Sequence, residues 1–373
     1  MRRTLVVTND FPPRQGGIQS FIHEVAIRQP ADSVVVYASD HAGSAQFDAA
    51  QPFPVVRHDS GLLVPTPAVR RQALALLRAH GCRAVWFGAS APLGLLAPAL
   101  REGGAQRIVA STHGHEVGWA MLPGARQALR RIGRHCDIIT YLGDYTRRRL
   151  RGAFGPHAAL RRLTPGVDVE TFHPGVDGSS VRSRYGLVGR PVIVCVSRLV
   201  ARKGQDTLIR ALPAIRAKVP DAALLLVGAG PYRDELAALA EQTGVTQHVV
   251  LTGGVPWSEL PAHYAAGDVF AMPCRTRRAG MDVEGLGIVY LEASAVGLPV
   301  LAGASGGAPD AVREGETGFV VDGRDEQAVA EQLITLLADP DLRARMGAAG
   351  RAWVQRDWRW DVVARQLTEM LQG

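Results

Sequence analysis

Short runs of apolar and β-branched residues alternate with helix-like segments along this chain, and the series of runs begins twice. The first series occupies residues 5–8, 34–37, 84–87, 108–110 and 138–141, and the second occupies 192–196, 224–227, 249–252, 269–272, 299–301 and 319–321. Strands that alternate with helices form parallel sheets with helices on both faces. The alternation therefore predicts an α/β fold with two doubly wound, Rossmann-like domains.

The length of 373 residues agrees with two domains, because a single domain usually has roughly 150 residues. We expect residues 1–166 and 167–357 to form these domains. The segment 172–180 is rich in Gly, Pro and Ser and is predicted to connect the two sheets as a hinge, so that the domains face a cleft. Open parallel sheets bind ligands at the carboxyl ends of their strands, so functional residues are expected in the loops that follow the strands.

Composition excludes several other classes of protein. Apolar residues make up 47% of the chain and charged residues 21%, which is typical of a globular protein and not of a disordered one. The longest uncharged run, 84–100, contains two glycines and two prolines, so no transmembrane helix is predicted. The chain starts without an apolar segment of signal-peptide length, and we expect a cytoplasmic protein. The four cysteines are too widely spaced to indicate a zinc site or a disulfide framework.

Positive charge is concentrated in the first half of the chain. Residues 1–165 contain 21 arginines and 10 acidic residues, a net charge of +11, whereas the remainder has a net charge of −4. This asymmetry fits one basic face that docks on an anionic surface, either nucleic acid or membrane. Aromatic residues are only 6% of the chain and no basic-aromatic RNA motif is present, which weakens the nucleic-acid interpretation.

The loop after the first strand of each series contains residues that suit an anionic ligand. Gly16 and Gly17 follow the first strand of the chain, where adjacent glycines at a helix N-terminus let backbone N–H groups approach an anion or a sugar; an ordinary tight turn is the alternative. Arg198 and Lys203 follow the first strand of the second series, in a chain with 2 lysines and 40 arginines. Two cations at a strand end would neutralise a diphosphate leaving group; a solvated basic turn is the alternative.

Two glutamates lie eight residues apart across a glycine-rich turn. Glu284 is predicted in a loop, residues 287–289 are predicted to open a helix, and Glu292 lies about one turn inside it. Two carboxylates beside an anion site suggest hydrogen bonds to the hydroxyls of a sugar and a ribose, with a solvated acidic helix start as the alternative. Asp282 and Glu284 also match a metal-binding pair, an interpretation weakened by the two cations of the preceding loop.

His113 and His115 follow the run at 108–110 and are expected at the same end of their sheet. A histidine there would hydrogen-bond a transferring group or orient a carboxylate. The His-Gly-His pattern could also suggest a metal pair, but the sequence offers no third ligand. A histidine that is simply packed, or that caps a helix, is the alternative.

These features, in their order along the chain, resemble the signatures of the retaining, two-Rossmann-domain glycosyltransferases of the glycogen-synthase-like superfamily (glycosyltransferase family 4), which have the GT-B fold. The matching motifs are Gly16–Gly17, residues 164–174, Arg198 with Lys203, residues 228–231, and Glu284 with Glu292. Residues 8–13, 86–88, 111–119, 272–276, 280–284 and 358–360 resemble, more narrowly, the GDP-mannose-dependent mannosyltransferases that add an α-1,6-linked second mannose to phosphatidylinositol monomannoside in actinobacteria. The resemblance covers residues 1–373, although this chain has arginine where basic patches of the family contain lysine.

The resemblance implies a role for each matching position. Arg198 and Lys203 would hold the donor diphosphate, and Glu292 would hold the ribose. Glu284 and the backbone from Gly285 to Ile288 would hold the mannose, with His113 near it. Gly16 and Gly17 would approach both phosphate and acceptor. The catalytic set that it implies is His113, Arg198, Lys203 and Glu284, and the other donor-site positions are Gly16, Gly17, Val255, Gly285, Leu286, Gly287, Ile288 and Glu292. It implies no metal or other cofactor, and it implies that the closing helix, about 358–373, packs back on the N-terminal domain.

The implied function is retaining transfer of mannose from GDP-mannose to a phosphatidylinositol monomannoside, in glycolipid synthesis. The implied partners are a nucleotide-sugar donor, a phosphoinositide-type lipid and the anionic inner face of the plasma membrane, without nucleic acid. Four alternatives remain open: a transferase of the same fold with another nucleotide sugar and acceptor, a nucleic-acid-binding protein, a two-domain sugar-binding protein, and an epimerase.

A lipid acceptor would require the basic N-terminal half to reach a membrane. The arginines expected to dock there are Arg70, Arg71 and Arg78, and also Arg126, Arg130, Arg131 and Arg134. Leu74 and Leu77 are predicted to form an apolar stripe that enters the interface, with a solvated helix surface as the alternative.

Overall fold

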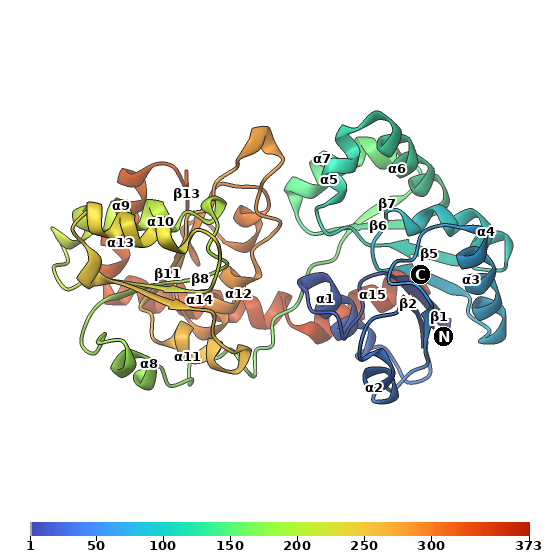
Figure 1. Cartoon of the computed structure of the whole chain (residues 1–373), viewed down its shortest axis with the longest axis horizontal. Helices are drawn as coiled ribbons and strands as arrows, with labels where there is room; N and C mark the ends of the chain where they lie inside the picture. Colours follow the sequence, from blue (N-terminus) through green and yellow to red (C-terminus); the bar gives the residue numbers. More distant parts are fainter. Residues whose placement is uncertain (1) are drawn as a thin grey trace. The chain divides into compact units, whose positions relative to one another are not determined.

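A computed structural model describes residues 2–373 and divides the chain into two compact units. Unit 1 comprises Met1–Gly166 and Trp360–Gly373, and unit 2 comprises Val167–Arg359. Each unit is built on a parallel sheet flanked by helices (Figure 1). The predicted fold class, two Rossmann-like doubly wound α/β domains, is confirmed.

Unit 1 contains a seven-stranded sheet with the order β3-β2-β1-β4-β5-β6-β7. Its strands are β1 (Thr4–Thr8), β2 (Val34–Ser39), β3 (Val55–His58), β4 (Ala84–Phe87), β5 (Arg107–Ala110), β6 (Ile138–Tyr141) and β7 (Ala159–Arg162). Val6 of β1 lies opposite both Val36 of β2 and Trp86 of β4, in parallel register. Strand order reverses between β1 and β4, which is the position where doubly wound sheets bind ligands.

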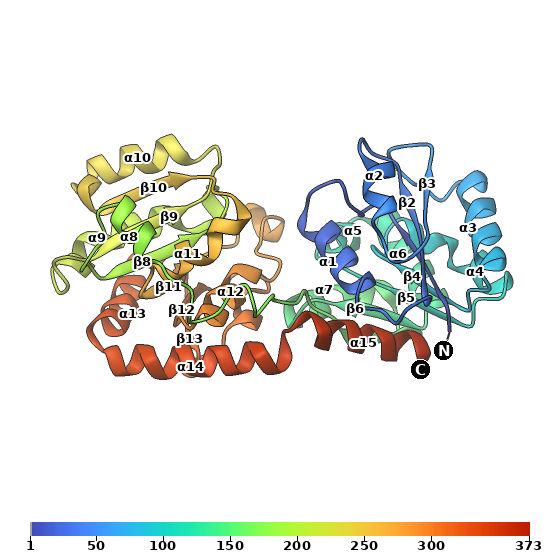
Figure 2. The ribbon, with the colours of Figure 1, turned by 90° about the horizontal axis from the view of Figure 1, so that it is seen from below.

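The helices of unit 1 cover the two faces of this sheet. They are α1 (Gly17–Ala26), α2 (Ser44–Ala49), α3 (Pro67–Ala79), η1 (Leu93–Leu96), α4 (Ala97–Glu102), α5 (Glu116–Met121), α6 (Pro123–His135), α7 (Asp144–Phe154) and α15 (Trp360–Gln372). Leu5 and Val7 of β1 share a core with α3, α4, α6 and α7, while Val6 shares the opposite core with α1 and α15. Helix α15 lies beside α1 and contacts β4 and β5 (Figure 2).

Helix α3 buries its apolar face in unit 1. The Thr66 side chain accepts a hydrogen bond from the Val69 N–H, and Pro67 occupies the first turn, so both N-terminal signals are in place. Leu77 is 2% exposed and Leu74 packs against the same core. The prediction that Leu74 and Leu77 form a membrane-facing stripe is therefore wrong, because the stripe covers the sheet.

Unit 2 contains a six-stranded sheet with the order β10-β9-β8-β11-β12-β13. Its strands are β8 (Val192–Val196), β9 (Ala223–Val227), β10 (Val249–Gly253), β11 (Val269–Met272), β12 (Val300–Gly303) and β13 (Gly318–Val321). Its helices are α8 (Ser179–Arg184), η2 (Ala201–Lys203), α9 (Gln205–Arg216), α10 (Arg233–Gln242), η3 (Thr246–His248), η4 (Trp257–Glu259), α11 (Leu260–Ala265), η5 (Arg278–Gly280), α12 (Ile288–Val296), η6 (Ala308–Ala311), α13 (Glu326–Ala338) and α14 (Pro340–Asp357). The strands form the centre of one large apolar core.

Every predicted run overlaps a strand, but two strands of unit 1 were not predicted. β3 and β7 lie at the two edges of the sheet, and β7 is mostly exposed with the sequence Ala-Leu-Arg-Arg. An edge strand needs less apolar surface than a central one, so these two lack the signal on which the prediction rested.

The segment 172–180 is not the connection between the units. It lies inside unit 2, and Phe172 is 2% exposed in the core of that unit. Glycine, proline and serine mark turns as well as linkers, and here they form a turn before α8. No helix within residues 2–373 is long and apolar enough to cross a membrane.

Candidate functional site

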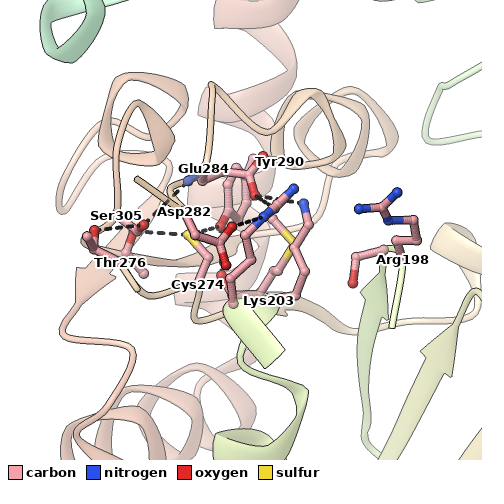
Figure 3. Close-up of polar contacts among 12 residues, drawn as sticks. Arg198, Lys203, Cys274, Thr276, Asp282, Glu284, Tyr290 and Ser305 are labelled. Atoms are coloured by element: carbon pink, nitrogen blue, oxygen red, sulfur yellow. Dashed lines mark hydrogen bonds and ion pairs between the residues drawn. The ribbon is translucent and has the colours of Figure 1, made fainter. Parts of the chain in front are cut away.

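Three loops of unit 2 meet at the carboxyl ends of β8, β11 and β12. The strand order of this sheet reverses between β8 and β11. The loop after β8 carries Arg198 and Lys203, the loop after β11 carries Glu284, and the loop after β12 carries Ser305 (Figure 3). These loops therefore occupy the ligand-binding edge of a doubly wound sheet.

Glycines allow the three loops to touch. Gly204 has a φ of +79°, and a Cβ at this position would lie 2.0 Å from the carbonyl oxygen of Pro273. Gly306 has a φ of +57°, and its Cβ would lie 2.0 Å from the carbonyl oxygen of Glu284. The Gly307 N–H donates to that same Glu284 carbonyl at 2.9 Å. No side chain fits between these backbones, so the sequence requires glycine where the loops cross.

A buried ion pair lies where the loops meet. Lys203 Nζ donates to Glu284 Oε2 at 2.7 Å, and the two side chains are 10% and 8% exposed. Arg202 approaches the same carboxylate oxygen with Nη1 at 3.7 Å, and its Nε lies 3.2 Å from Asp282 Oδ1. Two cations and two carboxylates are thus balanced in one network (Figure 3). Removing one member would leave another charge buried without a partner, which is costly.

The backbone of Glu284 is also held in place. Its N–H lies 3.4 Å from Ser305 Oγ, and that hydroxyl is 3.1 Å from Thr276 Oγ1. Within residues 2–373 the Oε1 atom of Glu284 makes no hydrogen bond, so this oxygen can accept one from a ligand hydroxyl.

The side chain of Arg198 differs from Lys203 because it is exposed. Gln205 Nε2 donates to Ser197 Oγ at 2.8 Å and to the Arg198 carbonyl at 3.0 Å, which fixes the backbone of the loop. The guanidinium of Arg198 has no ion pair or hydrogen bond among the described residues, and Figure 3 shows it apart from the Lys203 network. Arg198 therefore presents a free cation at the strand end, whereas Lys203 already has a carboxylate partner.

Helix α12 begins directly after the Glu284 loop, as predicted. Gly287 adopts a φ of +79° before the first helical residue, Ile288, and no side chain caps the helix. The N–H groups at the start of such a helix are available to an anion.

Glu292 lies one turn into α12 and is separate from the Lys203 network. The Tyr264 hydroxyl donates to its Oε2 at 2.6 Å. Burial raises the pKa of the Glu292 carboxyl, partly offset by the hydrogen bond from Tyr264. Val255, the remaining donor-site position, lies partly buried in the loop after β10.

His113 occupies the loop after β5 at the ligand-binding edge of unit 1. Its Nε2 lies 2.7 Å from the Gly88 carbonyl, and because a carbonyl only accepts, Nε2 carries the proton and Nδ1 is left as an acceptor. Burial lowers the pKa of the His113 imidazole, and nearby Glu116 partly opposes this effect. The ring packs edge-to-face on Phe21 with a centroid distance of 5.2 Å. Phe21 belongs to α1, so the helix that begins at Gly17 lies beside His113.

Glu116 positions this histidine loop and was missed as a functional residue. It is fully buried, and its Oε2 accepts from the N–H groups of His113 at 3.0 Å and Gly114 at 3.2 Å. Its Oε1 accepts from Ser90 Oγ at 3.2 Å. Glu116 follows His115 in the sequence, but acidic residues are common at helix starts. Its position alone therefore does not show that its carboxylate is buried.

Gly16 and Gly17 lie exposed at the start of α1. A Cβ on Gly17 would meet nothing within 4 Å, whereas a Cβ on Gly16 would lie 2.1 Å from Gln19 Oε1. Gln19 is held by Asp10 through a 2.8 Å hydrogen bond. A side chain at position 17 would therefore meet no packing clash inside unit 1.

Arg202, Ser305 and Tyr264 complete the surroundings of the unit 2 site, and sequence reasoning did not single them out. Arg202 adjoins Lys203, and its charge was the one signal that could have identified it. Among residues 2–373 no group of three or more His, Cys, Asp or Glu side chains is arranged to hold a metal ion.

Comparison with known families places both units among glycosyltransferases. Residues 181–353 match the model described as "Glycosyl transferases group 1", and residues 15–171 match "Glycosyltransferase Family 4". The chain is 55% identical over 374 residues to a GDP-mannose-dependent alpha-(1-6)-phosphatidylinositol monomannoside mannosyltransferase of Mycolicibacterium smegmatis, covering 99% of this chain and 98% of that protein. It is 54% identical over 380 residues to the protein of the same name in Mycobacterium tuberculosis H37Rv, with 100% and 99% covered.

A Corynebacterium glutamicum protein named as a GDP-mannose-dependent monoacylated alpha-(1-6)-phosphatidylinositol monomannoside mannosyltransferase is 49% identical over 377 residues, with 100% of this chain and 98% of that protein covered. Among solved structures, Anabaena Alr3699/HepE in complex with UDP has a TM-score of 0.81 at 20% identity and covers 99% of both chains. Sucrose-phosphate synthase of Thermosynechococcus elongatus has a TM-score of 0.76 at 21% identity, covering 100% of this chain and 98% of that chain. At this identity the solved structures support the shared fold.

Proposed function

This chain belongs to the glycosyltransferase family of the GDP-mannose-dependent phosphatidylinositol monomannoside mannosyltransferases, and we propose that it transfers mannose from GDP-mannose to a phosphatidylinositol monomannoside through an α-1,6 linkage. One observation carries the conclusion: the mycobacterial relatives with 54% to 55% identity over almost the full length share that name. The earlier prediction of family and function is confirmed.

The donor is proposed to bind at the strand ends of unit 2. Arg198 would contact the diphosphate with its free guanidinium, and the uncapped start of α12, from Gly285 to Ile288, would offer N–H groups to the donor. Glu292 would accept hydrogen bonds from the ribose hydroxyls, because Tyr264 donates to only one of its two carboxylate oxygens. Val255 would line the nucleotide side of the same site.

Glu284 and Lys203 are proposed to act together as an ion pair. The ion pair fixes the carboxylate, so that Oε1 can accept a hydrogen bond from a mannose hydroxyl. Lys203 would share its charge between Glu284 and the departing diphosphate, and it has the donors to do so because an ammonium group carries three. Negative charge grows on the diphosphate as the bond to mannose breaks, so these contacts strengthen toward the transition state.

The transfer proposed here retains the anomeric configuration, as the family implies. The bond between the mannose C1 and the diphosphate oxygen breaks, and the acceptor oxygen forms a bond to C1 on the same face. The acceptor hydroxyl gives its proton to the leaving diphosphate, which becomes GDP. Arg198 and Lys203 would supply the positive charge, so we expect turnover to continue in the presence of a metal chelator.

Unit 1 is proposed to serve the acceptor and the transferred sugar. His113 would be neutral and would offer Nδ1 as an acceptor to a mannose hydroxyl, because Nε2 is committed to Gly88. Gly16 and Gly17 would let the acceptor phosphate approach the start of α1. The acceptor is a lipid, so we propose that the protein works at the anionic cytoplasmic surface of the membrane as a peripheral protein.

The decisive experiment compares donors and acceptors directly. The purified chain is incubated with GDP-mannose, UDP-glucose or UDP-N-acetylglucosamine, together with phosphatidylinositol monomannoside in its unacylated and monoacylated forms. We expect one hexose to be added from GDP-mannose only, and linkage analysis to give an α-1,6 bond. Transfer from a UDP-sugar, another linkage, or isomerisation of the donor without transfer would contradict the proposal.

A further inference from the structure

Arg202 lies between two carboxylates of the unit 2 site and uses only part of its guanidinium. Its Nε lies 3.2 Å from Asp282 Oδ1, and its Nη1 lies 3.7 Å from Glu284 Oε2. The Nη1 atom is buried and makes no hydrogen bond within residues 2–373. Buried polar atoms of native proteins nearly always have a partner, so this atom points to a partner that it gains in another state of the site.

Lys203 holds the carboxylate oxygen that Arg202 does not reach. Its Nζ donates to Glu284 Oε2 at 2.7 Å, and this is the oxygen that lies 3.7 Å from Arg202 Nη1. A separation of 3.7 Å is too long for a hydrogen bond, although it is within the range of an ion pair. Arg202 is therefore a second cation that waits beside an occupied carboxylate (Figure 3).

The backbone of Arg202 is fixed, so that only its side chain needs to move toward Glu284. The Arg275 N–H donates to the Arg202 carbonyl at 2.8 Å. The Arg275 guanidinium in turn donates to Asp206 Oδ2 at 2.7 Å and to Thr207 Oγ1 at 3.0 Å. These contacts tie the loop after β8 to the loop after β11 and to the start of α9. A small rotation of one side chain can thus bring Nη1 to the carboxylate without a change in either loop.

A diphosphate bound at these strand ends would compete with Glu284 for Lys203. As the ammonium group turns toward the diphosphate, its hold on the carboxylate weakens. The Glu284 side chain is only 8% exposed, so water cannot replace the lost cation, and a buried charge without a partner is costly. Arg202 can replace it, because a planar guanidinium can keep Nε on Asp282 and offer Nη1 to Glu284 at the same time.

We infer that Arg202 is a positioning residue that takes over Glu284 Oε2 when Lys203 turns toward the donor diphosphate. The carboxylate then keeps its orientation during the transfer, and its Oε1 stays available to a mannose hydroxyl. In this arrangement Arg202 acts through Glu284 and contacts neither the diphosphate nor the mannose. The inference deepens the proposed function, because it rests on a nucleoside diphosphate that binds at the strand ends of unit 2.

The test is a double-variant cycle on nucleotide binding, which requires no turnover. The variants are Arg202→Met, Glu284→Gln and the two combined. Methionine removes the charge of the arginine and keeps part of its apolar stem. The affinities for GDP and for UDP are measured by calorimetry, and thermal unfolding is recorded for every variant. Transfer of mannose by the unmodified protein is measured in parallel.

Arg182 offers a matched control in the same unit. Its Nη2 lies 2.9 Å from Asp268 Oδ2, and the two side chains are 22% and 29% exposed, against 22% and 30% for Arg202 and Asp282. Asp268 directly precedes β11, at the opposite edge of the sheet from the candidate site. Arg182→Met therefore removes an ion pair of the same kind and exposure without reaching the strand ends that bind the ligand.

We expect Arg202→Met to weaken GDP binding about tenfold, which is typical of the coupling between residues of one ion-pair network. In the Glu284→Gln background the same substitution should change GDP affinity by less than about twofold, because a neutral amide needs no replacement cation. Arg202→Lys keeps the charge but not the planar fork, so it should lose less than Arg202→Met. Arg182→Met should bind GDP as the unmodified protein does and should lower the unfolding temperature about as much as Arg202→Met.

Two results would overturn the inference. The first is a GDP affinity of Arg202→Met equal to that of the Arg182→Met control. The second is an equal loss of affinity in the presence and absence of Glu284→Gln. Such an equal loss would mean that Arg202 contacts the nucleotide itself, or, if the unfolding temperature falls well below that of the control, that it only stabilises the loop.

Failure of the proposed function gives a different pattern. Binding of UDP in place of GDP, without transfer of mannose by the unmodified protein, would refute the proposed donor. The cycle measured with UDP would then still decide the role of Arg202. If neither nucleotide binds the unmodified protein, both the proposed function and the inference are refuted.

Discussion

The two units share one architecture but use charge in opposite ways. In unit 2, Lys203, Arg202, Glu284 and Asp282 form a compact ion-pair network at the strand ends. In unit 1, the histidine at the equivalent edge has a lowered pKa, and exposed arginines lie on α3, α6 and α7. The net charge is also unequal along the chain, at +11 in residues 1–165 and −4 in residues 166–373.

This difference shows what burial requires of a charged residue. An exposed arginine can remain unpaired because water solvates it, whereas a buried lysine needs a carboxylate beside it. Substitutions in the two classes should therefore have different effects on stability, even where both classes serve the same ligand.

Lys203→Ala should give the largest effect, and it should reduce both turnover and stability. The variant loses a contact to the leaving diphosphate, worth about a hundredfold to a thousandfold in turnover. It also leaves the buried Glu284 with only the more distant Arg202, at 3.7 Å, as a cation, which costs up to about 3 to 5 kcal/mol. Steady-state kinetics and thermal unfolding measure the two effects.

A double variant separates these two contributions of Lys203. Lys203→Met combined with Glu284→Gln removes both charges of the pair and should recover most of the lost stability without recovering turnover. An unfolding temperature of Lys203→Ala equal to that of the unmodified protein would mean that the ion pair does not stabilise unit 2.

Arg198→Ala should reduce turnover about a hundredfold and leave the unfolding temperature unchanged. Its guanidinium is exposed and has no partner among the described residues, so its removal leaves no other charge without a partner. Kinetics and thermal unfolding are again compared. Turnover within about threefold of the unmodified protein would remove Arg198 from the mechanism.

Glu292→Gln should weaken GDP binding about tenfold, whereas Glu284→Gln should leave GDP binding nearly unchanged and lower turnover. An ionised Glu292 accepts hydrogen bonds from ribose hydroxyls more strongly than a protonated one, and burial raises its pKa. GDP affinity should therefore fall on acidification at a higher pH than for an ordinary glutamate, and this dependence should disappear in Glu292→Gln. Calorimetry at several pH values decides this; equal GDP affinity in both variants would refute the division of roles.

His113→Gln should have the smallest effect, a loss of turnover of a few-fold, because glutamine can keep the hydrogen bond to the Gly88 carbonyl. His113→Ala is the comparison and should lose more. The folded-state pKa of His113 is below its unfolded value, so stability is complete above the unfolded pKa and falls as the pH drops through the folded one. In the glutamine variant the unfolding temperature should fall less on acidification than in the unmodified protein. The same pH dependence in both proteins would contradict this prediction.

Several features of this protein followed from local sequence alone. Strands with apolar runs, such as β8 and β11, matched the predicted residues, because a buried parallel strand must be apolar on both faces. The start of α12 after Gly287 followed from the glycine turn. The positions of Arg198, Lys203 and Glu284 after strands followed from the rule that ligands bind at strand ends.

Contacts between residues far apart in the chain could not be predicted from the local sequence. Lys203 and Glu284 are 81 positions apart, and nothing local shows that one neutralises the other while Arg198 stays free. Leu77 lies in α3 and Leu122 lies directly before α6, yet one is 2% exposed and the other 63%. The period of a sequence defines which residues share a face, but which face meets the core, and which charges meet, depends on how the elements pack.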